Sequence, residues 1–471
     1  MKLVWFRNDL RCRDNPALYN ACQRADGKGV VAVAALCAEQ WSSHDESSAR
    51  VEFWLANLHS LQAELADLNI PLRVIKAGTF DRVPEQLFSL ARELQCDGLF
   101  MNREYCLNEV LRDKRVVERF HEDGIEVFGF HADVVLPPGS VMNGQGNPFR
   151  VFTPFSKAWR REFTAQYPQL LPLPEIQPGS LSGELQGGDS LPDTLAYSVG
   201  NASWCEELWP AGAEAAHQRL QQFVVGKAED YDNQRDFPAA DGTSAISPYL
   251  SCGVLSPRQC LAALQVQFAP DSWLDSQWTT EIIWREFYRH LIVHFPEMNR
   301  WQPFKPEVES RIHWLHDDQL FDAWCRGETG YPIVDAGMKQ LLATGWMHNR
   351  VRMIVASFLT KLLREDWRRG ARFFMQHLVD GDFASNLGGW QWSASVGADA
   401  APYFRIFSPM RQAERFDPQG EYVARWLPEL KALSGLQRHD PKCAAALGRP
   451  LPIIDYSRAR AESLASYQQA G

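Results

Sequence analysis

The 471-residue sequence has few of the features that mark membrane, secreted or fibrous proteins. Its hydrophobic runs are short, residues 30–37 being among the longest, so no segment can span a membrane as a helix. The chain passes directly from Met1 and Lys2 into a strand-like segment, residues 3–6, without the apolar core of a signal peptide. Apolar residues make up 45% and charged residues 23%, which excludes disordered, collagen-like and coiled-coil classes. We therefore expect a globular, cytoplasmic protein.

Cysteine pairs and the common nucleotide-binding motifs are also missing. None of the ten cysteines belongs to a C-x-x-C pair, which predicts reduced thiols, no structural zinc and no metal site. The first predicted strand leads into Arg7-Asn8-Asp9-Leu10-Arg11 instead of G-x-G-x-x-G, which disfavours NAD at this point. The sequence contains no P-loop, no H-E-x-x-H and no G-x-S-x-G.

The first 130 residues alternate strand and helix patterns. Val- and Ile-rich apolar segments predict strands buried on both faces, at residues 3–6, 30–37, 72–77, 98–102 and 125–130. Residues 49–68 have the helical period, and Asn15-Pro16 is typical of a helix N-cap followed by proline. We predict a Rossmann-like α/β domain with a parallel sheet that lacks the G-x-G-x-x-G motif.

Helical periodicity dominates the second half of the chain. Residues 167–203 are rich in Pro, Gly and Ser and indicate a linker. Beyond it, helices are predicted at residues 213–225, 257–266, 279–294, 331–344, 349–363 and 371–379. The resulting division is an α/β domain (1–130), a connector (131–205) and a large all-α domain (206–471).

Charge and tryptophan are unevenly distributed along the chain. The net charge is −10, yet residues 338–372 contain eight basic and two acidic residues. Such a local excess of positive charge would suit a phosphate backbone, the alternative being a solvated helix face. Eleven of the 17 tryptophans follow residue 270, which indicates an aromatic core, a stacking site or an electron-transfer role.

Three clusters carry candidate chemistry. Residues 281, 284, 285 and 288 share one helix face, which suits a heteroaromatic ligand; the alternative is a surface helix with an internal Glu–Arg pair. Residues 243–247 offer hydroxyl and backbone N–H groups to an anion, or form a plain N-cap. Asp380 and Asp382 lie in a glycine-containing loop that lacks the later ligands of an EF-hand, so they are better hydrogen-bond acceptors than cation ligands.

Together, in order along nearly the whole chain, these segments resemble the photolyase/cryptochrome flavoprotein family, in particular class I deoxyribodipyrimidine photolyases of bacteria. The resemblance is carried by WFRNDLR at residues 5–11, WREFY at 284–288, GYPIVDA at 330–336, GWMHNR at 345–350, DGD at 380–382 and PYFRIF at 402–407. It implies an enzyme with an N-terminal α/β domain and a helical FAD domain. Light would excite the reduced, anionic FAD, which would transfer an electron to a cyclobutane pyrimidine dimer flipped out of DNA and recover it after the ring splits.

The resemblance assigns roles to individual residues. FAD would be bound by Tyr231, Thr243, Ser244, Ala245, Ile246, Ser247, Trp278, Arg352, Asp380, Gly381, Asp382 and Asn386, with Asn386 near N5 and Arg352 paired with Asp380. Glu281, Asn349 and Asn386 would be catalytic. DNA and the dimer would contact Glu281, Trp284, Arg285, Tyr288, Asn349, Arg350, Met353, Trp392 and Gln412. Trp390, Trp367 and Trp314 match the electron-hopping rings that photoreduce oxidised flavin.

The resemblance also implies a second, light-harvesting chromophore and a monomeric protein. His44, Asn108 and Glu109 match positions around 5,10-methenyltetrahydrofolate in the folate-type enzymes. The family's lysine contact is not obvious in residues 296–302, so a deazaflavin stays open as the alternative antenna.

Three other functions were weighed against dimer repair. A (6-4) photolyase would have histidine at Asn349 and Met353 to perform acid–base chemistry. A signalling cryptochrome usually has a long C-terminal extension and altered stacking residues, whereas Trp284 and Trp392 are both present and the chain ends at Gly471. The third alternative is a helical scaffold or flavin electron carrier without a DNA role.

Overall fold

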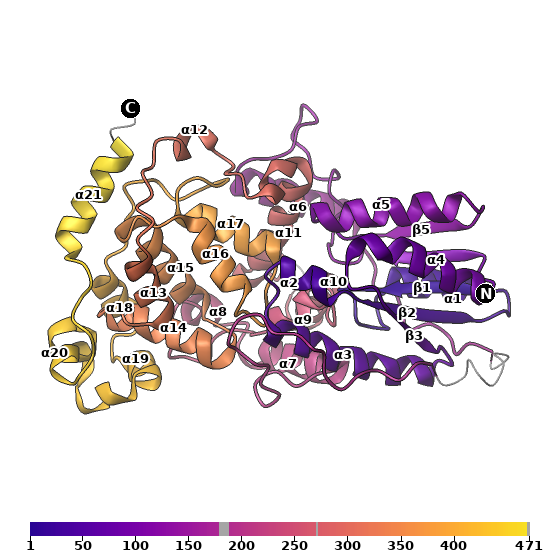
Figure 1. The fold of residues 1–471 in the computed structure, drawn as a ribbon, viewed down its shortest axis with the longest axis horizontal. Helices are drawn as coiled ribbons and strands as arrows, with labels where there is room; N and C mark the ends of the chain where they lie inside the picture. The colour runs from indigo at the N-terminus through magenta and orange to yellow at the C-terminus, as the bar shows by residue number, and fades with distance from the viewer. Residues whose placement is uncertain (179–187, 270–271, 469–471) are drawn as a thin grey trace.

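Five parallel strands form a single sheet in the computed structural model, which describes residues 1–178, 188–269 and 272–468. The strand order is β3-β2-β1-β4-β5, and Leu3 of the central strand β1 lies opposite Val31 and Leu99 of its two neighbours. The sheet occupies one half of the molecule and the helical region the other (Figure 1). The strands are β1 (Lys2–Phe6), β2 (Val30–Leu36), β3 (Leu72–Lys76), β4 (Gly98–Asn102) and β5 (Glu126–Phe130).

Successive side chains of the central strands point to opposite faces of the sheet, and each face packs into its own hydrophobic core. Val4 and Phe6 pack in one core with residues of α1 and α3, whereas Leu3 and Trp5 pack in a second core with residues of α4 and α5. Because both faces are covered, the central strands β1, β2 and β4 are buried along nearly their whole length, as predicted. The edge strands β3 and β5 are mostly half-buried, so the prediction of burial on both faces was wrong for these two. The helices of this half are α1 (Pro16–Gln23), α2 (Ala38–Ser43), α3 (Ser48–Asp67), α4 (Val83–Glu93) and α5 (Leu107–His121).

The predicted helix start at Asn15-Pro16 is confirmed. The Asn15 side chain accepts a hydrogen bond from the backbone N–H of Leu18, and Pro16 is the first helical residue. Asn15 is also bonded to Asn102 at the end of β4, so this cap ties α1 to the sheet.

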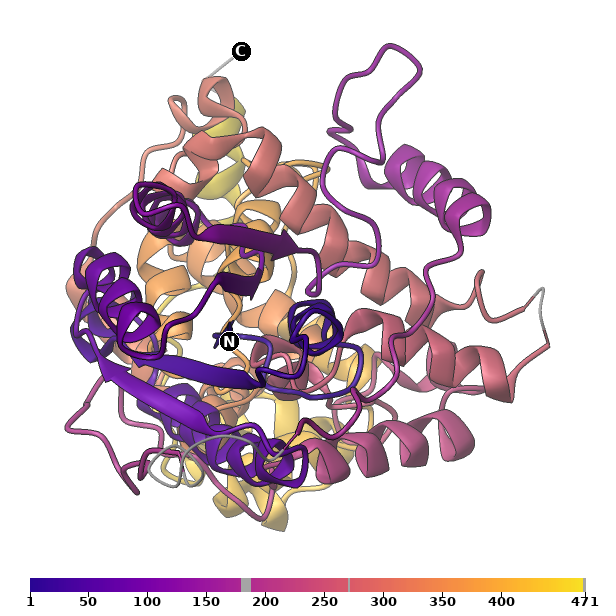
Figure 2. The same ribbon diagram turned by 90° about the vertical axis from the view of Figure 1, so that its right-hand side faces the viewer.

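The rest of the chain is helical, as predicted. Figure 2, an end-on view, shows the helices behind the sheet and the C-terminal segments on the side away from the N-terminus. The helices are α6 (Phe152–Gln166), α7 (Ala213–Gly226), α8 (Tyr231–Gln234), α9 (Ser247–Ser251), α10 (Pro257–Gln267), α11 (Gln277–His294), α12 (Pro306–Glu309), α13 (Asp318–Arg326), α14 (Pro332–Thr344), α15 (Asn349–Ser357), α16 (Trp367–Met375), α17 (Phe383–Ser393), α18 (Pro409–Phe416), α19 (Glu421–Trp426), α20 (Pro441–Ala446) and α21 (Tyr456–Gln468).

Two predicted helices were wrong in extent: one changes form after Ser357, and the other covers Trp367–Met375 instead of residues 371–379. The helix predicted over residues 349–363 changes after Ser357 into a π-helical turn, Phe358–Leu362. The helix predicted over 371–379 begins at Trp367, because the Asp366 side chain caps its first turn by accepting from the backbone N–H of Arg368. Apolar periodicity alone placed the start of this helix four residues too late, because it does not take account of the side-chain cap at Asp366.

The predicted linker runs along the sheet instead of hanging free of it. Asp189 pairs with the edge strand β3: its backbone N–H donates to Leu72 O at 2.8 Å, and its side chain accepts from Val74 N–H and pairs with Arg73. This contact covers part of a sheet edge that would otherwise expose unpaired backbone groups. The predicted linker residues 179–187 lie outside the described residues.

The loop after β1 docks the sheet onto the helical region. Arg11 is almost fully buried and donates to the carbonyls of Asp14, Ala132 and Gly253. Gly253 has a φ of +68° and lies so close to this loop that an added Cβ would come within 2.0 Å of Asn8 O. The RNDLR segment is therefore used for docking between the two halves. No helix within the described residues is both long and apolar enough to cross a membrane.

Candidate functional site

A cavity of about 430 Å³ lies within the helical region, mainly between α11, α15 and α17. We call it the central cavity, and its volume is typical of a cofactor or substrate pocket. Many of the predicted site residues line it although they are distant in sequence. They are Glu281, Trp284, Arg285, Tyr288, Asn349, Arg352, Met353, Asp380, Asp382, Asn386, Trp390 and Trp392.

The other residues predicted to bind FAD or DNA or to transfer electrons do not line the central cavity. Trp278 is buried and its indole N–H donates to Ser244 Oγ at 3.3 Å. Gln412 is half-buried on α18. The residues that do not line the central cavity are Tyr231, Thr243, Ser244, Ala245, Ile246, Ser247, Trp278, Trp314, Arg350, Trp367, Gly381 and Gln412.

A charged pair forms one wall of the central cavity. The Arg352 guanidinium contacts both carboxylate oxygens of Asp380, at 2.8 and 3.0 Å, so the predicted ion pair is present. Ser247 Oγ donates to the same carboxylate at 2.6 Å, which connects residues 243–247, the predicted anion-binding segment, to the central cavity. Because the Asp380 side chain is only 3% exposed, water does not weaken these charge-assisted bonds.

Asp382 is a second carboxylate held ionised at the cavity. It caps α17 by accepting from the backbone N–H of Ser385 and pairs with Arg289 at 2.6 Å. Burial by itself would raise the pKa of Asp382, but Arg289 and Arg285, together with the hydrogen bonds from Ser385, lower it well below its ordinary value. The wall therefore keeps a fixed negative charge.

The segment before α9 has unused donors. Within the described residues, the backbone N–H groups of residues 243–247 donate to no protein acceptor. The N-cap of α9 is Ile246 and makes no side-chain cap, so the plain N-cap alternative is wrong. Free N–H groups beside the hydroxyls of Thr243, Ser244 and Ser247 suit a phosphate group. With the Arg352–Asp380 pair nearby, the residues present fit FAD.

The helix face predicted on α11 is confirmed, but its internal ion pair is not. Glu281 pairs with Arg235 and accepts from Gln277 Nε2 at 2.8 Å, so its partners come from another segment and from the preceding turn. Arg285 pairs instead with Asp133. Glu281 thus presents a carboxylate at the cavity, 29% exposed, with one side already bonded.

Trp284 is held as a stacking platform. Its ring lies parallel to that of Phe152 on α6, with the centroids 3.6 Å apart and the planes 5° apart. Phe152 is buried and fixes the ring from one side, while Trp284 still lines the central cavity. A ring pre-ordered in this way loses little conformational freedom when a base stacks on it.

Glycine permits the close approach of α17 to α11. An added Cβ at Gly388 would come within 2.1 Å of the Tyr288 ring, so only glycine fits there. Gly370 of α16 similarly leaves room for the Trp390 ring, at 2.2 Å from the added Cβ. These contacts bring Tyr288 and Trp390 to the cavity wall.

His348 caps the helix that carries Asn349, Arg352 and Met353. Its Nδ1 accepts from the backbone N–H of Arg350 at 3.2 Å, which requires an unprotonated nitrogen. Burial, together with the nearby Arg350 and Arg352, lowers the pKa of His348 to about 4 against the opposing effect of Asp236. The cap is therefore intact at neutral pH.

This cap predicts a loss of stability in mild acid. The pKa of His348 lies near the ordinary histidine value of about 6.5 in the unfolded chain and at about 4 in the folded protein, so the unfolded chain binds more protons between these values. As pH falls from 6.5 to 4, the free energy of unfolding should drop by about 3 kcal/mol from this residue. Urea unfolding at pH 7.5 and pH 4 measures the drop. His348→Gln, which keeps an acceptor but cannot be protonated, should reduce it, whereas the exposed control His313→Gln should not. An equal drop in wild type and His348→Gln would contradict the assignment.

The positive excess of residues 338–372 is largely neutralised in the folded protein. Acidic residues from distant segments pair with most of the arginines, and Lys361 is fully buried, so this run is no bare phosphate-binding face. The pairs are Arg350–Asp236, Arg352–Asp380, Arg364–Glu462, Arg368–Glu309 and Arg369–Asp318. Composition could not show this, because the five partners named lie outside the basic segment, and the segment's own acids, Asp366 and Glu365, pair with Arg368 and Arg369.

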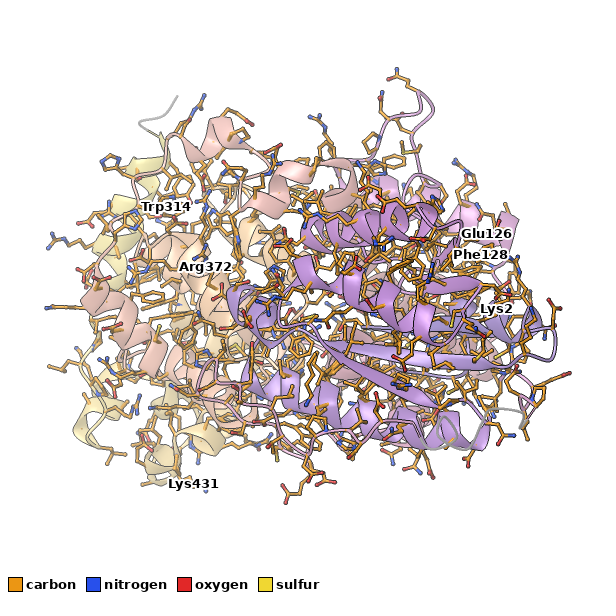
Figure 3. All side chains as sticks on the ribbon, turned by 45° about the vertical axis from the view of Figure 1, so that its right-hand side comes forward. Lys2, Glu126, Phe128, Trp314, Arg372 and Lys431 are labelled. Atoms are coloured by element: carbon orange, nitrogen blue, oxygen red, sulfur yellow. The ribbon has the colours of Figure 1, made fainter. Side chains whose placement is uncertain are left out.

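The three predicted electron-transfer tryptophans differ in exposure. Trp390 and Trp367 are buried, and Trp314 is half-buried. Trp390 lines the central cavity and makes an edge contact with Phe374 at 5.0 Å. Figure 3 shows Trp314 in the helical half, away from Lys2, Glu126 and Phe128 of the sheet. Of the three rings, Trp314 is therefore the one that reaches solvent.

A second cavity, of about 420 Å³, lies where the sheet meets the helical region, and we call it the junction cavity. The three predicted antenna residues line it together: His44 Nε2 is 2.8 Å from Asn108 Nδ2, and His44 Nδ1 is 3.7 Å from Glu109. Burial and the neighbouring Glu104 raise the pKa of Glu109 to about 7. Arg372, labelled in Figure 3, lines this cavity from the helical side.

Asp382 lines both cavities, so the two sites meet at the start of α17. A further pocket inside the α/β half, beside Trp5 and Trp54, has room for about 50 Å³. Such a volume holds a few waters and no tricyclic ring. Within the described residues, no group of three or more His, Cys, Asp or Glu side chains could hold a metal ion.

Several residues of the site were not found from sequence. Arg235 and Gln277 orient Glu281, Phe152 stacks on Trp284, and Asp133 pairs with Arg285. None of these four residues belongs to a recognisable motif. Three of them lie far in sequence from the side chain that they contact, and Gln277 lies one helical turn before Glu281. Phe404 has an exposed aromatic side chain in the loop that follows Trp392. It belongs to the PYFRIF motif at residues 402–407, but the sequence assigned it no separate role.

Comparison with known proteins agrees with this geometry. Residues 2–177 match the family model described as DNA photolyase, and residues 278–469 match the one described as the FAD binding domain of DNA photolyase. The deoxyribodipyrimidine photo-lyase of Salmonella typhimurium is 44% identical over 476 residues, which cover 99% of this chain and 98% of that protein. The chain therefore belongs to the DNA photolyase family.

Solved structures show the same architecture. A bacterial class III photolyase from Agrobacterium tumefaciens matches with a TM-score of 0.86 and 35% identity, over 100% of this chain and 97% of that one. An archaeal photolyase from Sulfolobus tokodaii with two FAD molecules matches with a TM-score of 0.82 and 27% identity, over the full length of both chains. The predicted fold, an α/β half followed by a helical FAD-binding half, is confirmed.

Proposed function

We propose that the central cavity binds FAD and the pyrimidine dimer side by side, and that this chain is a light-driven deoxyribodipyrimidine photo-lyase that repairs cyclobutane dimers in DNA. The observation that carries the proposal is the shared cavity: one wall is the Arg352–Asp380 pair, and the other carries Glu281, Trp284 and Trp392. Bound FAD supplies the electron that splits the dimer and is returned afterwards, so the protein's task is to bind, orient and exclude water.

The cofactor would be held on the Asp380 side. The hydroxyls and free N–H groups of residues 243–247 would bind its phosphates, with Tyr231 and Trp278 beside them. Arg352 would place a cation next to the ring, which would favour the anionic reduced state. Asp380, Asp382 and Asn386 would complete the pocket, with Gly381 between the two carboxylates in sequence. The Asn386 side-chain amide donates to Ala371 O at 2.9 Å, which fixes its oxygen for the ring edge.

The dimer would enter from the Trp284 side after flipping out of the duplex. Damaged bases stack and pair poorly, so flipping them costs less than flipping normal bases. Trp284 and Trp392 would stack on the dimer, Glu281 and Asn349 would hydrogen-bond to it, and Met353 would pack against it. Tyr288, Arg285, Arg350 and Gln412 would support the DNA, and the exposed Phe404 ring would fill the gap left in the duplex.

Replacing Glu281 by alanine should lower repair without loss of FAD. The carboxylate is the charged acceptor on the dimer side, and a charge-assisted hydrogen bond contributes about 1.5–3 kcal/mol, so the yield per absorbed photon should fall about ten-fold or more. Repair of a thymine-dimer oligonucleotide by chemically reduced protein measures this yield. Glu118→Ala, an exposed carboxylate on α5, is the control. Unchanged repair per photon in Glu281→Ala would overturn the role of Glu281.

The three tryptophans Trp390, Trp367 and Trp314 would carry electrons inward to oxidised FAD. Repair by pre-reduced protein does not need them. We expect Trp314→Phe to slow photoreduction of oxidised FAD at least about ten-fold while leaving repair by reduced protein intact, because phenylalanine is much harder to oxidise. Absorbance of bound FAD under blue light gives the rate. Trp426→Phe, another half-buried tryptophan, is the control. Undiminished photoreduction in Trp314→Phe would mean that a different tryptophan is the exit.

The junction cavity would hold the antenna, and 5,10-methenyltetrahydrofolate is the chromophore we propose for it. The His44–Asn108–Glu109 cluster lines about 420 Å³ there, whereas the pocket inside the α/β half is too small for a deazaflavin. We further propose residues 1–130 as the antenna domain, 131–205 as the connector and 206–471 as the FAD and DNA domain, in a cytoplasmic monomer. The absorption spectrum of chromophore released from purified protein separates folate from deazaflavin.

A further inference from the structure

Trp367, the middle ring of the proposed electron chain, is hydrogen-bonded to a carboxylate. Its ring is fully buried, and its indole N–H donates to Glu309 Oε1 at 2.7 Å. Glu309 is the last residue of α12 and 58 positions away in sequence. Its segment is anchored to the end of α17, since Lys305 N–H donates to Val396 O at 2.8 Å and Phe304 N–H donates to the Gln391 side chain.

The same carboxylate neutralises a cation that lies over the Trp367 ring. The Arg368 guanidinium is 4.6 Å from the ring centroid and donates to both oxygens of Glu309, at 2.9 and 2.8 Å. Asp366 is its second acidic partner, at 3.2 Å. The negative end of this arrangement therefore points at the indole N–H, and the positive end lies over the ring face.

These charges act in opposite directions on an oxidised ring. A tryptophan that has lost an electron is a cation, so Arg368 destabilises it and Glu309 stabilises it. Both groups are mostly buried, the Glu309 side chain being 15% exposed, so water screens them weakly. Within the described residues Trp390 has no such charged partner, and it packs against aromatic rings, among them Phe374 and Trp324.

We infer that Glu309 makes Trp367 easier to oxidise than Trp390 and so drives the electron vacancy outward from the cavity. This inference rests on the proposed electron chain. The step is a single electron transfer from Trp367 to oxidised Trp390: Trp390 is reduced, Trp367 is oxidised, and no bond forms or breaks. The initial oxidant is the light-excited oxidised flavin. Glu309 acts through Trp367 and is a positioning residue.

Charge-changing variants give a pattern that a structural role would not produce. In Glu309→Gln the oxygen still accepts the indole N–H, but Arg368 is left facing the ring with Asp366 as its remaining partner. We expect the yield of long-lived oxidised tryptophan, measured by transient absorption after a laser flash, to fall about ten-fold. Arg368→Gln should raise it or leave it unchanged, and the double variant should return close to wild type. Glu307→Gln, an exposed neighbour on α12, is the control.

A second readout does not depend on the cofactor. The indole N–H of Trp367 should give a downfield nitrogen–proton NMR signal in flavin-free protein, identified by its absence in Trp367→Phe, and Glu309→Gln should move it upfield. Equal radical yields in wild type and Glu309→Gln, or a double variant as impaired as the single one, would overturn the inference. If Trp367→Phe itself photoreduces normally, the electron chain is wrong, and the error lies in the proposed function.

Discussion

Replacing Asp380 by alanine should give a protein that purifies without bound FAD. The Asp380 carboxylate is buried and accepts hydrogen bonds from Arg352 and Ser247. Its removal therefore leaves the Arg352 guanidinium unpaired and breaks the hydrogen bond that holds residues 243–247 at the cavity. Breaking such a buried pair costs about 3–5 kcal/mol, and we expect bound FAD per chain to fall at least about 100-fold. Flavin absorbance relative to protein absorbance after purification measures the loss.

Asp380→Asn separates loss of the cofactor from loss of the fold. Asparagine keeps the size and one acceptor oxygen, so it should preserve circular dichroism and weaken FAD binding by about ten-fold. The control is Asp241→Ala: Asp241 is close in sequence to residues 243–247, but its side chain is 87% exposed, so this variant should retain FAD. A yellow Asp380→Ala protein with a full complement of flavin would show that the Arg352–Asp380 pair does not hold the cofactor.

Replacing Trp284 by alanine should abolish tight binding of damaged DNA. Stacking of a base on an aromatic ring contributes about 1–3 kcal/mol, and alanine would also leave the Phe152 ring without its partner. We expect affinity for a thymine-dimer oligonucleotide to fall about 10- to 100-fold, while affinity for undamaged DNA and FAD content stay near wild type. Fluorescence anisotropy at one fixed salt concentration measures both affinities.

Trp284→Phe serves as the matched variant. It keeps an aromatic surface against Phe152 and should recover a substantial part of the affinity for damaged DNA. If Trp284→Ala binds damaged and undamaged DNA with unchanged discrimination, the dimer does not stack on this ring, and the electron-carrier or photosensor alternatives would gain support.

The architecture could be predicted from sequence because its signals are local. Strands such as β2 are buried on both faces and are therefore apolar throughout. The start of α1 could be predicted because its signal consists of two adjacent residues, Asn15 and Pro16. The boundaries that failed, at Ser357 and Trp367, depend on a π-helical turn and on a cap at Asp366, neither of which changes the apolar period.

The site was predictable only as far as its residues belong to motifs. Four residues of α11 fall on one face because helical spacing requires it, and the Arg352–Asp380 pair followed from the family resemblance. Partners supplied by other segments were not predictable. Asp133 takes Arg285 away from an internal pair with Glu281, and Asp236 neutralises Arg350, because folding brings together groups that no local pattern connects.

The central claim is light-driven repair, and repair of a thymine-dimer oligonucleotide tests it most directly. Purified protein, chemically reduced, would be incubated with the oligonucleotide under near-UV to blue light, alongside a dark control. We predict that intact thymines return only in the light and at many turnovers per chain. Bound FAD without any light-dependent repair, on single- or double-stranded DNA, would contradict the account and favour a photosensor.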